Sequence, residues 1–307
     1  MALYRLEQSL TALKQELQDK ARPETEFILA DVRDAEKIER LFKKHKPEIV
    51  FHAAAYKHVP IIEDNVNAGV ANNILGTYAV AKAAATCKTE RFVLVSTDKA
   101  VRPTNIMGAT KRMAELVIQA FAQKRGQTAF SMVRFGNVLG SSGSVIPLFR
   151  NQIATGGPVT VTHPEITRFF MTINEAAQLV IQAGSMAKGG EVFLLDMGEP
   201  VKILKLARLM IQLSGKTTRD ASRPNGDVEI VYTGLRPGEK LYEELLVNDD
   251  ALATQHPKIM MASEKAINGA TLEKVIVRLK KSVETDDVSG SLKVLSEFVE
   301  GFDREKS

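Results

Sequence analysis

Leucines recur at helical spacing at the start of the chain. They occupy positions 3, 6, 10, 13 and 17, with mostly polar residues between them. Because residues three and four apart share one face of a helix, this pattern predicts an amphipathic helix over residues 2–20. We therefore expect the chain to open on a helix.

Short apolar runs alternate with helical patterns between residues 26 and 135. Strands are predicted at 26–30, 49–53, 92–95 and 132–135, and helices near 35–45, 66–86 and 109–124. Such alternation is typical of βαβ units, which build a parallel sheet covered by helices on both faces. The expected fold class is therefore α/β, with a doubly wound parallel sheet.

The rhythm changes beyond residue 140. A flexible segment at 140–143 and a turn at 155–158 precede strand-then-helix pairs at 192–213 and 228–247. We interpret these pairs as a smaller lobe woven into the carboxyl end of the sheet. The final stretch is predicted to be helical over 272–302, with an interruption at 286–290.

Composition narrows the class of protein. With 307 residues, 44% of them hydrophobic, the chain is long enough to bury a substantial core. The net charge of +4 is too small to require a nucleic-acid partner, and a basic pocket for an anionic substrate accounts for it. The single cysteine, Cys87, cannot form an internal disulfide, and no apolar run approaches the ~20 residues of a membrane helix. These features predict a cytoplasmic protein with no membrane span in this chain.

Hydroxyl, carboxyl and amine groups follow the strand predicted at 92–95. Residues 96–99 read Ser-Thr-Asp-Lys and would reach the carboxyl edge of the sheet, where ligands of open α/β sheets bind. The plainer interpretation is that these polar residues cap the next element. We favour a site, because Met107 and Lys111 follow four residues apart and would share one helix face.

A second charged group occurs late in the chain. The turn 234–240 reads Gly-Leu-Arg-Pro-Gly-Glu-Lys and carries Arg236 and Glu239, while Arg168 lies in Thr-Arg-Phe-Phe-Met. A guanidinium group suits the oxygens of a diphosphate, and a carboxylate accepts hydrogen bonds from ribose hydroxyls. A solvated charge cluster is the ordinary interpretation of such a turn. The pairing with Arg168 favours nucleotide binding.

Several runs resemble one family. Residues 96–112 read S-T-D-K-A-V-R-P-T-N-x-M-G-x-T-K-R, residues 52–60 read H-A-A-A-Y-K-H-V-P, and residues 134–147 read R-F-G-N-V-L-G-S-S-G-S-V-I-P. Together with the turn at 234–240, they resemble the bacterial UDP-N-acetylglucosamine 4,6-dehydratases. These are extended short-chain dehydrogenases/reductases of polysaccharide biosynthesis, which make sugars for capsule, lipopolysaccharide and flagellin glycans. The family normally has a tyrosine where this chain has Met107, but its larger, membrane-anchored forms have a methionine there.

The resemblance implies an internal redox cycle on NAD, with NADP as the alternative. Hydride leaves C4 of the hexose, the ketone acidifies H5, water is lost across C5 and C6, and hydride returns to C6. Lys99 would be the base at C5, Asp98 the acid for the 6-hydroxyl, and Thr97 the partner of the 4-oxygen. Met107 takes the tyrosine position, and Lys111 would fix the nicotinamide ribose. A lysine that acts as a base needs a pKa lowered by burial or by nearby cations.

The resemblance also assigns binding residues. Those at the cofactor are Asp31, Val32, Ala53, Ala54, Ala55, Lys57, Asn73, Val95, Ser96, Lys111 and Val138. Those at the UDP-sugar are Lys57, Asn137, Ser141, Ser142, Val145, Arg168, Arg236 and Glu239. By themselves, several of these motifs would also suit a helix cap, tight packing or a flexible loop. No metal site is expected.

The opening motif of a dinucleotide-binding fold is missing. Such a fold begins with a strand, a G-x-x-G-x-x-G turn and a helix whose N-terminus holds the pyrophosphate. Gly136, Gly140 and Gly143 have the nearest spacing but belong to a late loop. We therefore expect a sheet that lacks its first two strands and has a central gap. Weak or absent NAD binding by this chain alone follows, and sub-micromolar binding in a calorimetric titration would refute it.

Three parts and three functions are predicted. An incomplete NAD-binding Rossmann domain spans 1–140, a UDP-sugar lobe interleaved with the sheet spans 141–262, and a helical segment spans 263–307.

The first function is a UDP-sugar 4,6-dehydratase. The second is a dehydratase that also inverts C5, or a 4-epimerase. The third is a non-catalytic fragment that binds a UDP-sugar or a partner chain. A homo-oligomer is expected.

Overall fold

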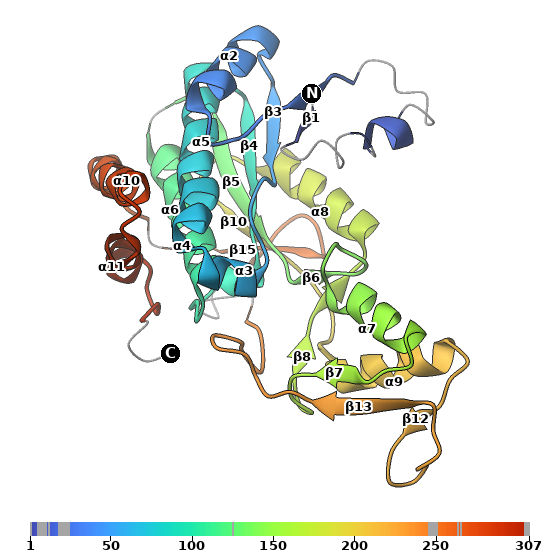
Figure 1. Cartoon of the computed structure of the whole chain (residues 1–307). Helices are drawn as coiled ribbons and strands as arrows, with labels where there is room; N and C mark the ends of the chain where they lie inside the picture. The colour runs from blue at the N-terminus through green and yellow to red at the C-terminus, as the bar shows by residue number, and fades with distance from the viewer. Residues whose placement is uncertain are drawn as a thin grey trace.

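The computed structural model describes residues 2–4, 11, 13–17, 25–124, 126–244, 251–262, 264 and 266–303. Its centre is a six-stranded sheet with the strand order β14-β15-β10-β5-β4-β3 (Figure 1). The strands are β3 (Ile49–His52), β4 (Arg91–Val95), β5 (Ala129–Arg134), β10 (Val192–Leu195), β14 (Leu252–Ala253) and β15 (Ile259–Ala262). The four strands from β3 to β10 are parallel, and β15 is antiparallel to β10. The predicted α/β class is confirmed.

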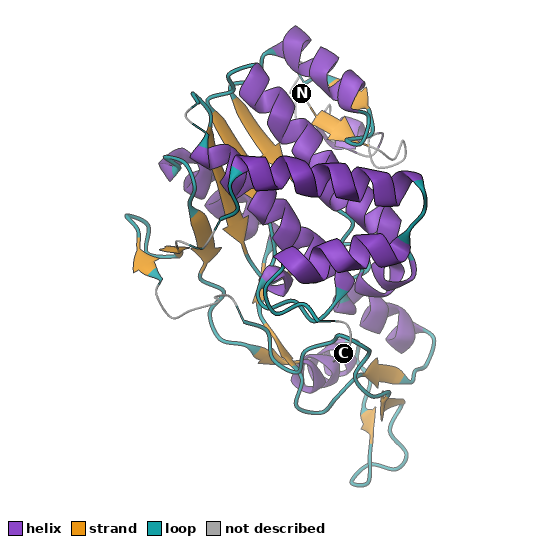
Figure 2. Ribbon diagram, turned by 90° about the vertical axis from the view of Figure 1, so that its left-hand side faces the viewer, coloured by secondary structure: helices purple, strands orange, loops and turns teal. Residues whose placement is uncertain are grey.

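Helices cover both faces of this sheet. In β4, Phe92 and Leu94 belong to one hydrophobic cluster, while the valine between them belongs to another. The first cluster lies under α5 (Gly76–Thr86) and α6 (Ile106–Gln123), and the second under α8 (Ile173–Met186) (Figures 1 and 2). Because successive side chains point to opposite faces, a strand covered on both sides must be apolar throughout.

The helix predicted at 66–86 is present but irregular. It begins as α4 (Val66–Gly69), widens into a π-helical turn, η1 (Val70–Leu75), and continues as α5. A widened turn of this kind is often found at functional sites. Here it carries Asn73, one of the predicted site residues.

Two helices at the end of the chain pack outside this layer. They are α10 (Gly269–Glu284) and α11 (Val288–Phe298). Both contact α6 and α4, and α10 also contacts the π-helical turn. The break between them overlaps the interruption predicted at 286–290. The helical character predicted for 272–302 is therefore confirmed as far as Phe298, and residues 299–302 are not helical.

The start of the chain differs from the expected helix over residues 2–20. Ala2–Tyr4 form strand β1, which pairs in parallel with β2 (Phe27–Leu29), and helical residues are described at 11 and 13–17. Leu6 and Leu10 lie outside the described residues. The opening helix was wrong at its first residues because β2 offers backbone partners there, and tertiary pairing overrides a local helical pattern.

Among the described strands, β2 does not join the six-stranded sheet. It leads through α2 (Ala35–His45) to β3, yet β2 pairs only with β1, and β3 forms the edge of the larger sheet. The predicted gap between these two strands therefore agrees with the described pairing. On β3, Ile49 and Phe51 are 46% and 45% exposed.

A smaller lobe lies beyond the carboxyl end of the sheet (Figure 1). In it, β7 (Val159–Val161) pairs in parallel with β13 (Val228–Tyr232). The helices α7 (Val145–Ala154) and α9 (Ile203–Leu213) pack with these strands around a separate hydrophobic cluster. The lobe predicted after residue 140 is thus present, although β10 belongs to the central sheet.

The helix predicted after the strand at 228 is wrong over its described part. Residues 233–244 form turns and extended backbone, and 245–250 lie outside the described residues. Pro237 has no amide hydrogen for a helix, and Gly238 has a φ of 71°, which ends helical geometry.

Among the helices that the structure describes, none has the length and apolar character needed to cross a bilayer.

Candidate active site

The residues after β4 reach the carboxyl edge of the sheet. Backbone pairing continues past the strand, because the N–H groups of Ser96 and Asp98 donate to carbonyls at the end of β5, at 2.7 and 3.2 Å. Thr97 and Lys99 line a cavity, while the Asp98 side chain is fully buried. The strand end therefore delivers its polar groups to the predicted edge.

The start of α6 packs directly against these residues. Asn105 caps the helix, and its side chain accepts a hydrogen bond from Gly108 N–H at 2.8 Å. A Cβ added to Gly108 would overlap the carbonyl oxygen of Lys99, so this approach requires glycine. The close packing brings Met107 and Lys111, one helical turn apart, to the cavity wall.

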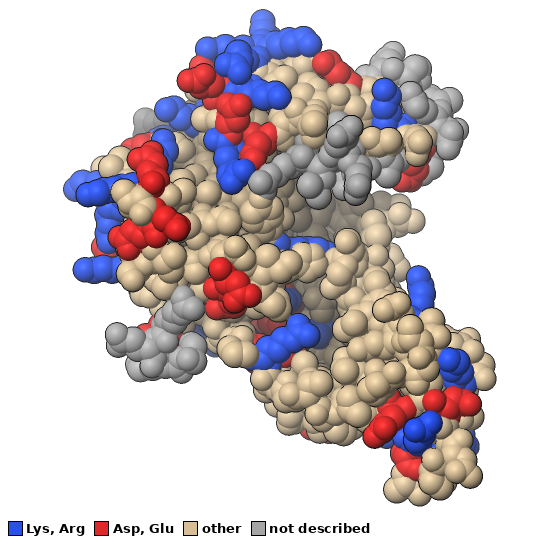
Figure 3. All heavy atoms as spheres, in the orientation of Figure 1, with Lys and Arg blue, Asp and Glu red and all other residues tan. Residues whose placement is uncertain are grey.

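We call this space of about 320 Å³ the lysine cavity. Its lining residues are Ala53, Ala55, Tyr56, Lys57, His58, Val95, Ser96, Thr97, Lys99, Met107, Lys111, Phe135, Gly136, Asn137, Val138, Ser141, Gly143 and Ser144. Figure 3 shows the surface hollowed between the sheet and the smaller lobe, with basic side chains in the hollow. The cavity brings together residues that the sequence placed at both cofactor and sugar.

Carboxylates hold the Lys99 ammonium. Its Nζ donates to Asp98 Oδ1 at 3.0 Å and to Asn137 Oδ1 at 3.4 Å, and lies 3.6 Å from Glu243 Oε1. Burial favours the neutral amine, but the two carboxylates outweigh burial and raise the pKa of Lys99 above its ordinary value. The lowered pKa expected for this lysine is therefore wrong in this arrangement, because the charge of Asp98, followed by that of Glu243, outweighs burial.

The two oxygens of Asp98 differ. Oδ1 accepts a hydrogen bond from Thr97 Oγ1 at 2.8 Å as well as from Lys99. Oδ2 is buried without a hydrogen-bond partner among the described residues, and lies 3.0 Å from the position of a Cβ added to Gly136. A buried polar atom left unpaired costs free energy, so a hydrogen-bond donor that reached this oxygen would be stabilising.

Lys111 has the opposite electrostatic character. Its Nζ donates to Val95 O at 2.7 Å, and burial, only partly offset by Glu115, lowers the pKa of Lys111 to about 8. His52 lies close by, and burial followed by the Lys111 charge lowers its pKa to about 3. The His52 imidazole is therefore neutral at pH 7. Of the two lysines predicted to be catalytic, only Lys111 has a lowered pKa.

A buried charged cluster beneath the cavity was missed in the sequence. Glu115 and Arg134 are fully buried and hydrogen-bond to each other, and Arg112 and Glu264 complete the cluster. Burial alone would raise the pKa of Glu115, but the arginines outweigh burial and hold this pKa at about 2. Ser96 Oγ donates to Glu115 at 2.6 Å, which ties the end of β4 to α6. The signal available in the sequence was a charged residue inside an apolar run: Glu115 in the run that forms α6, and Arg134 in the run that forms β5.

Some predicted cofactor residues lie outside the cavity. Ala54 is exposed, and Asn73 is buried, where its side chain accepts from Tyr56 N–H at 2.7 Å and donates to Tyr56 O at 3.0 Å. Asn73 therefore fixes the loop after β3. Asp31 lines a separate pocket beside α2 and α5, and Val32 is buried in the core. The described structure does not bring Asp31 and Val32 to the lysine cavity.

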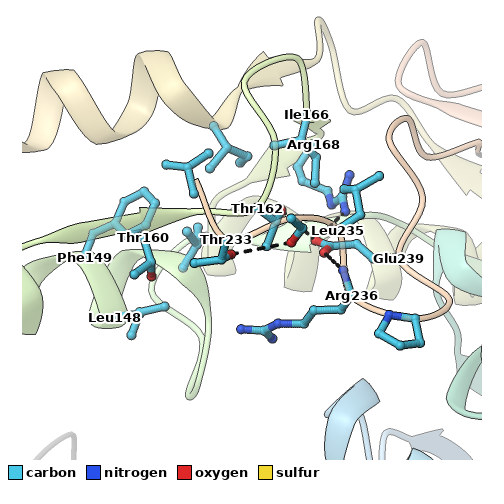
Figure 4. A pocket seen from close by; sticks show the side chains of 15 residues that line it. Leu148, Phe149, Thr160, Thr162, Ile166, Arg168, Thr233, Leu235, Arg236 and Glu239 are labelled. Carbon is cyan, nitrogen blue, oxygen red and sulfur yellow. Dashed lines mark hydrogen bonds and ion pairs between the residues drawn. The ribbon is translucent and has the colours of Figure 1, made fainter. Parts of the chain in front are cut away.

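A second space of about 610 Å³ lies in the smaller lobe, and we call it the arginine cavity (Figure 4). Its lining residues are Val145, Leu148, Phe149, Thr160, Val161, Thr162, Ile166, Arg168, Ile203, Thr233, Gly234, Leu235, Arg236, Pro237 and Glu239. Aliphatic walls with a few convergent polar groups are typical of sites for small organic ligands.

The two arginines of this cavity have different partners. Arg168 is buried, donates to two backbone carbonyls, and its Nη2 lies 3.2 Å from Glu239 Oε1. The Arg236 guanidinium has no hydrogen bond or ion pair with the described residues. In Figure 4 it points away from Glu239, toward the side where Leu148 lies. Arg236 is therefore the cation that a ligand anion can reach, and Arg168 is already engaged.

The predicted sugar-binding residues divide between the two cavities. The lysine cavity includes Lys57, Asn137 and Ser141, and the arginine cavity includes Val145, Arg168, Arg236 and Glu239. Ser142 is exposed and lines neither. Within the part of the chain that the structure describes, no group of three or more metal-ligating side chains occurs.

Comparisons with known proteins agree with this arrangement. The profile of a family described as polysaccharide biosynthesis protein matches residues 1–264. The capsular polysaccharide biosynthesis protein CapD of Staphylococcus aureus is 55% identical over 242 residues, which are 78% of this chain and 39% of that relative. The chain thus spans well under half the length of this relative.

Solved structures show the same fold. Pen from Bacillus thuringiensis has a TM-score of 0.75 at 35% identity, over 90% of this chain and 88% of that one. DesIV of Streptomyces venezuelae, a dTDP-glucose 4,6-dehydratase with NAD and TYD bound, has a TM-score of 0.62 over 85% of this chain and 81% of that one. Its 20% identity shows the fold alone. The motifs, the profile and the relatives together place this chain in the polysaccharide biosynthesis protein family, with the extended short-chain dehydrogenase/reductase fold.

Proposed function

We propose that the chain carries the sugar-remodelling site of an NAD-dependent 4,6-dehydratase that converts UDP-N-acetylglucosamine to a UDP-4-keto-6-deoxy sugar. The observation that supports this most is the convergence of Thr97, Lys99 and Lys111 on one cavity, with the buried Asp98 carboxylate hydrogen-bonded to the first two. The arginine cavity beside it supplies a free guanidinium for the diphosphate. A hexose in the lysine cavity and a uridine diphosphate in the arginine cavity would account for both cavities.

The residues around Lys111 fit the nicotinamide end of NAD. Ala53 and Ala55 are small enough for a ring to approach the backbone, and Lys111 has ammonium hydrogens beyond the one it donates to Val95. When bound, NAD supplies the hydride acceptor at C4 and the hydride donor at C6. The described residues include no glycine-rich turn for the pyrophosphate, so weak NAD binding by the chain alone stays a prediction.

The proton steps fall to three adjacent residues. Thr97 Oγ1 would hydrogen-bond the 4-oxygen instead of Asp98 when substrate is bound. The 4-hydroxyl proton released when hydride leaves C4 would finally replace the proton that Asp98 gives up with the departing water. Lys99 would take the proton from C5 as an amine, and Asp98 would give a proton to the departing 6-hydroxyl as an acid. Both forms arise at once when the proton in the 3.0 Å Lys99–Asp98 hydrogen bond passes from nitrogen to oxygen. A raised pKa of Lys99 is therefore compatible with a base formed by internal transfer.

Exchange of H5 with solvent deuterium tests this function. We expect the chain, given UDP-N-acetylglucosamine and enough NAD to overcome weak binding, to incorporate deuterium at C5 and to yield a 4-keto-6-deoxy product by proton NMR. Lys99→Ala should abolish the exchange, and undiminished exchange would remove Lys99 from this role. A product with inverted C5, or UDP-N-acetylgalactosamine, would identify the inverting dehydratase or the 4-epimerase instead.

A second candidate is a protein that binds UDP-sugar without catalysis. The described gap between β2 and β3 favours it, because the arginine cavity is complete while the cofactor side is not. Calorimetric binding of UDP together with no response to NAD would support this candidate. The cytoplasmic location and the homo-oligomer also remain proposals, and light scattering of the purified chain tests the latter.

A further inference from the structure

A buried carboxylate that the proposed steps do not use lies between the two cavities. The Glu243 side chain is 3% exposed, and its Oε1 lies 3.6 Å from Lys99 Nζ and 3.7 Å from Arg168 Nε. Arg168 is itself fixed by Glu239 and by two backbone carbonyls. Glu243 therefore has one cationic neighbour that is held in place and one that takes part in the proposed chemistry.

Few charged or titratable side chains lie near enough to Lys99 to change the stability of its ammonium form. The charged or titratable side chains facing it are Asp98 from its own 3-10 turn, Glu243 from the segment after β13, Arg168 from β8 (Thr167–Arg168), Lys111 from α6, and Lys57 and His58 from the loop after β3. Of these, only Asp98 and Glu243 are anionic. Asp98 can accept the Lys99 proton directly at 3.0 Å, whereas Glu243 at 3.6 Å acts through its charge.

We propose that Glu243 is a positioning residue that determines whether the proton shared by Lys99 and Asp98 resides on nitrogen or on oxygen. Transfer breaks an N–H bond, forms an O–H bond and removes both charges. Glu243 stabilises only the charged arrangement, since it attracts an ammonium but not an amine. Arg168 moderates this effect by neutralising part of the Glu243 charge. The catalytic meaning rests on the proposed function, but the influence of Glu243 on Lys99 does not.

Chemical labelling of Lys99 measures this influence without catalysis. The intact chain is treated with cyanate at pH 8, and carbamylation of Lys99 is followed by mass spectrometry, with Lys57 as an internal reference. Glu243→Gln keeps the size and removes the charge, so the pKa of Lys99 should fall, and labelling should be up to about tenfold faster. Glu243→Asp keeps the negative charge but places it farther from Lys99, so the increase in the labelling rate should be smaller.

A neighbouring carboxylate provides the matched control. Glu244 is exposed and pairs with Arg102 at 3.3 Å, away from Lys99, so Glu244→Gln should leave the labelling rate unchanged. Circular dichroism checks that each variant is folded. If Glu243→Gln does not fold, Glu243→Asp decides alone. Labelling of Lys99 at the wild-type rate in the folded Glu243 variants would overturn the inference.

The pH profile of H5 exchange then separates this inference from the proposed function. Where exchange occurs, Glu243→Gln should shift the limb governed by Lys99 to lower pH by up to about one unit, with KM for the nucleotide sugar within about threefold. A change in KM alone would make Glu243 a substrate contact and overturn the inference. Faster labelling in Glu243→Gln without any exchange in the wild-type chain would retain the inference and reject the dehydratase.

Discussion

The lysine cavity and the arginine cavity are built by different means. The first is walled by the ends of central strands and the start of α6, and a buried ion cluster lies beneath it. The second is walled by aliphatic and threonine side chains of the smaller lobe, with one unpaired guanidinium. The difference teaches that charges with a chemical task need a rigid, buried support, whereas holding a nucleotide needs shape and an accessible cation.

Removing the support of the lysine cavity should have the largest effect. Glu115→Ala leaves Arg134 and Arg112 buried without their shared carboxylate, so the free energy of unfolding should fall by about 3–5 kcal/mol. Urea unfolding followed by circular dichroism measures it, with Glu244→Ala as an exposed control expected within about 0.5 kcal/mol. Because the Glu115 pKa is about 2, its contribution should be lost as the pH falls from about 4.5 toward 2. A loss below about 1 kcal/mol would contradict a supporting role.

The next effect concerns the pH dependence of stability. Lys111 has a pKa of about 8 in the folded chain, so between pH 8 and the ordinary lysine pKa the unfolded chain binds more protons. The free energy of unfolding contributed by this group should therefore rise with pH, by up to about 3 kcal/mol. Urea unfolding at pH 8 and 10 should show this rise in the wild-type chain but not in Lys111→Met. Equal slopes in both proteins would contradict the burial argument.

For the arginine cavity we expect an effect on binding and little on stability. Arg236→Ala should weaken UDP binding by roughly ten- to a hundredfold, because a charge-assisted hydrogen bond contributes about 1.5–3 kcal/mol. Isothermal titration calorimetry measures this affinity. Arg150→Ala is a suitable control, because Arg150 is exposed on α7 and does not line the cavity. Equal affinities for Arg236→Ala and Arg150→Ala would show that the free guanidinium does not bind the diphosphate.

The smallest expected effect comes from a threonine in the same cavity. Thr162 Oγ1 donates to Glu239 Oε1 at 3.3 Å, which helps to orient that carboxylate. Thr162→Val should weaken UDP binding by about two- to fivefold, the effect of one neutral hydrogen bond at long distance. Calorimetry against the wild-type chain measures it. A loss as large as that of Arg236→Ala would mean that the Thr162 hydroxyl and its hold on Glu239 matter as much as the cation.

Local patterns predicted most of the fold. The apolar run of β4 and the periodicity of α6 are signals carried by a few neighbouring residues, and both elements were found where expected. The opening helix failed at Ala2–Tyr4 because pairing with β2 is a distant interaction. The helix after β13 failed because the turn containing Pro237 and Gly238 breaks helical geometry, and the described residues up to 244 form no helix.

The site was predictable where one motif supplies several groups. Thr97, Asp98 and Lys99 are consecutive, so the strand end that places one of them places all three. Glu243 and the ion cluster were missed because their partners are far along the chain: Arg134 is 19 residues from Glu115 and 130 from Glu264. Such pairs leave no periodic signal. The raised pKa of Lys99 comes first from its neighbour Asp98 and then from one of these distant contacts, Glu243.

The exposed edge of the central sheet has a consequence for the behaviour of the protein in solution. Soluble proteins usually protect such an edge with charged residues, proline or a bulge, but β3 reads Ile-Val-Phe-His and has neither charge nor proline. With Ile49 and Phe51 half exposed, this strand is a template on which another extended peptide can hydrogen-bond. Concentrated preparations are therefore expected to form oligomers or fibrils that grow from β3.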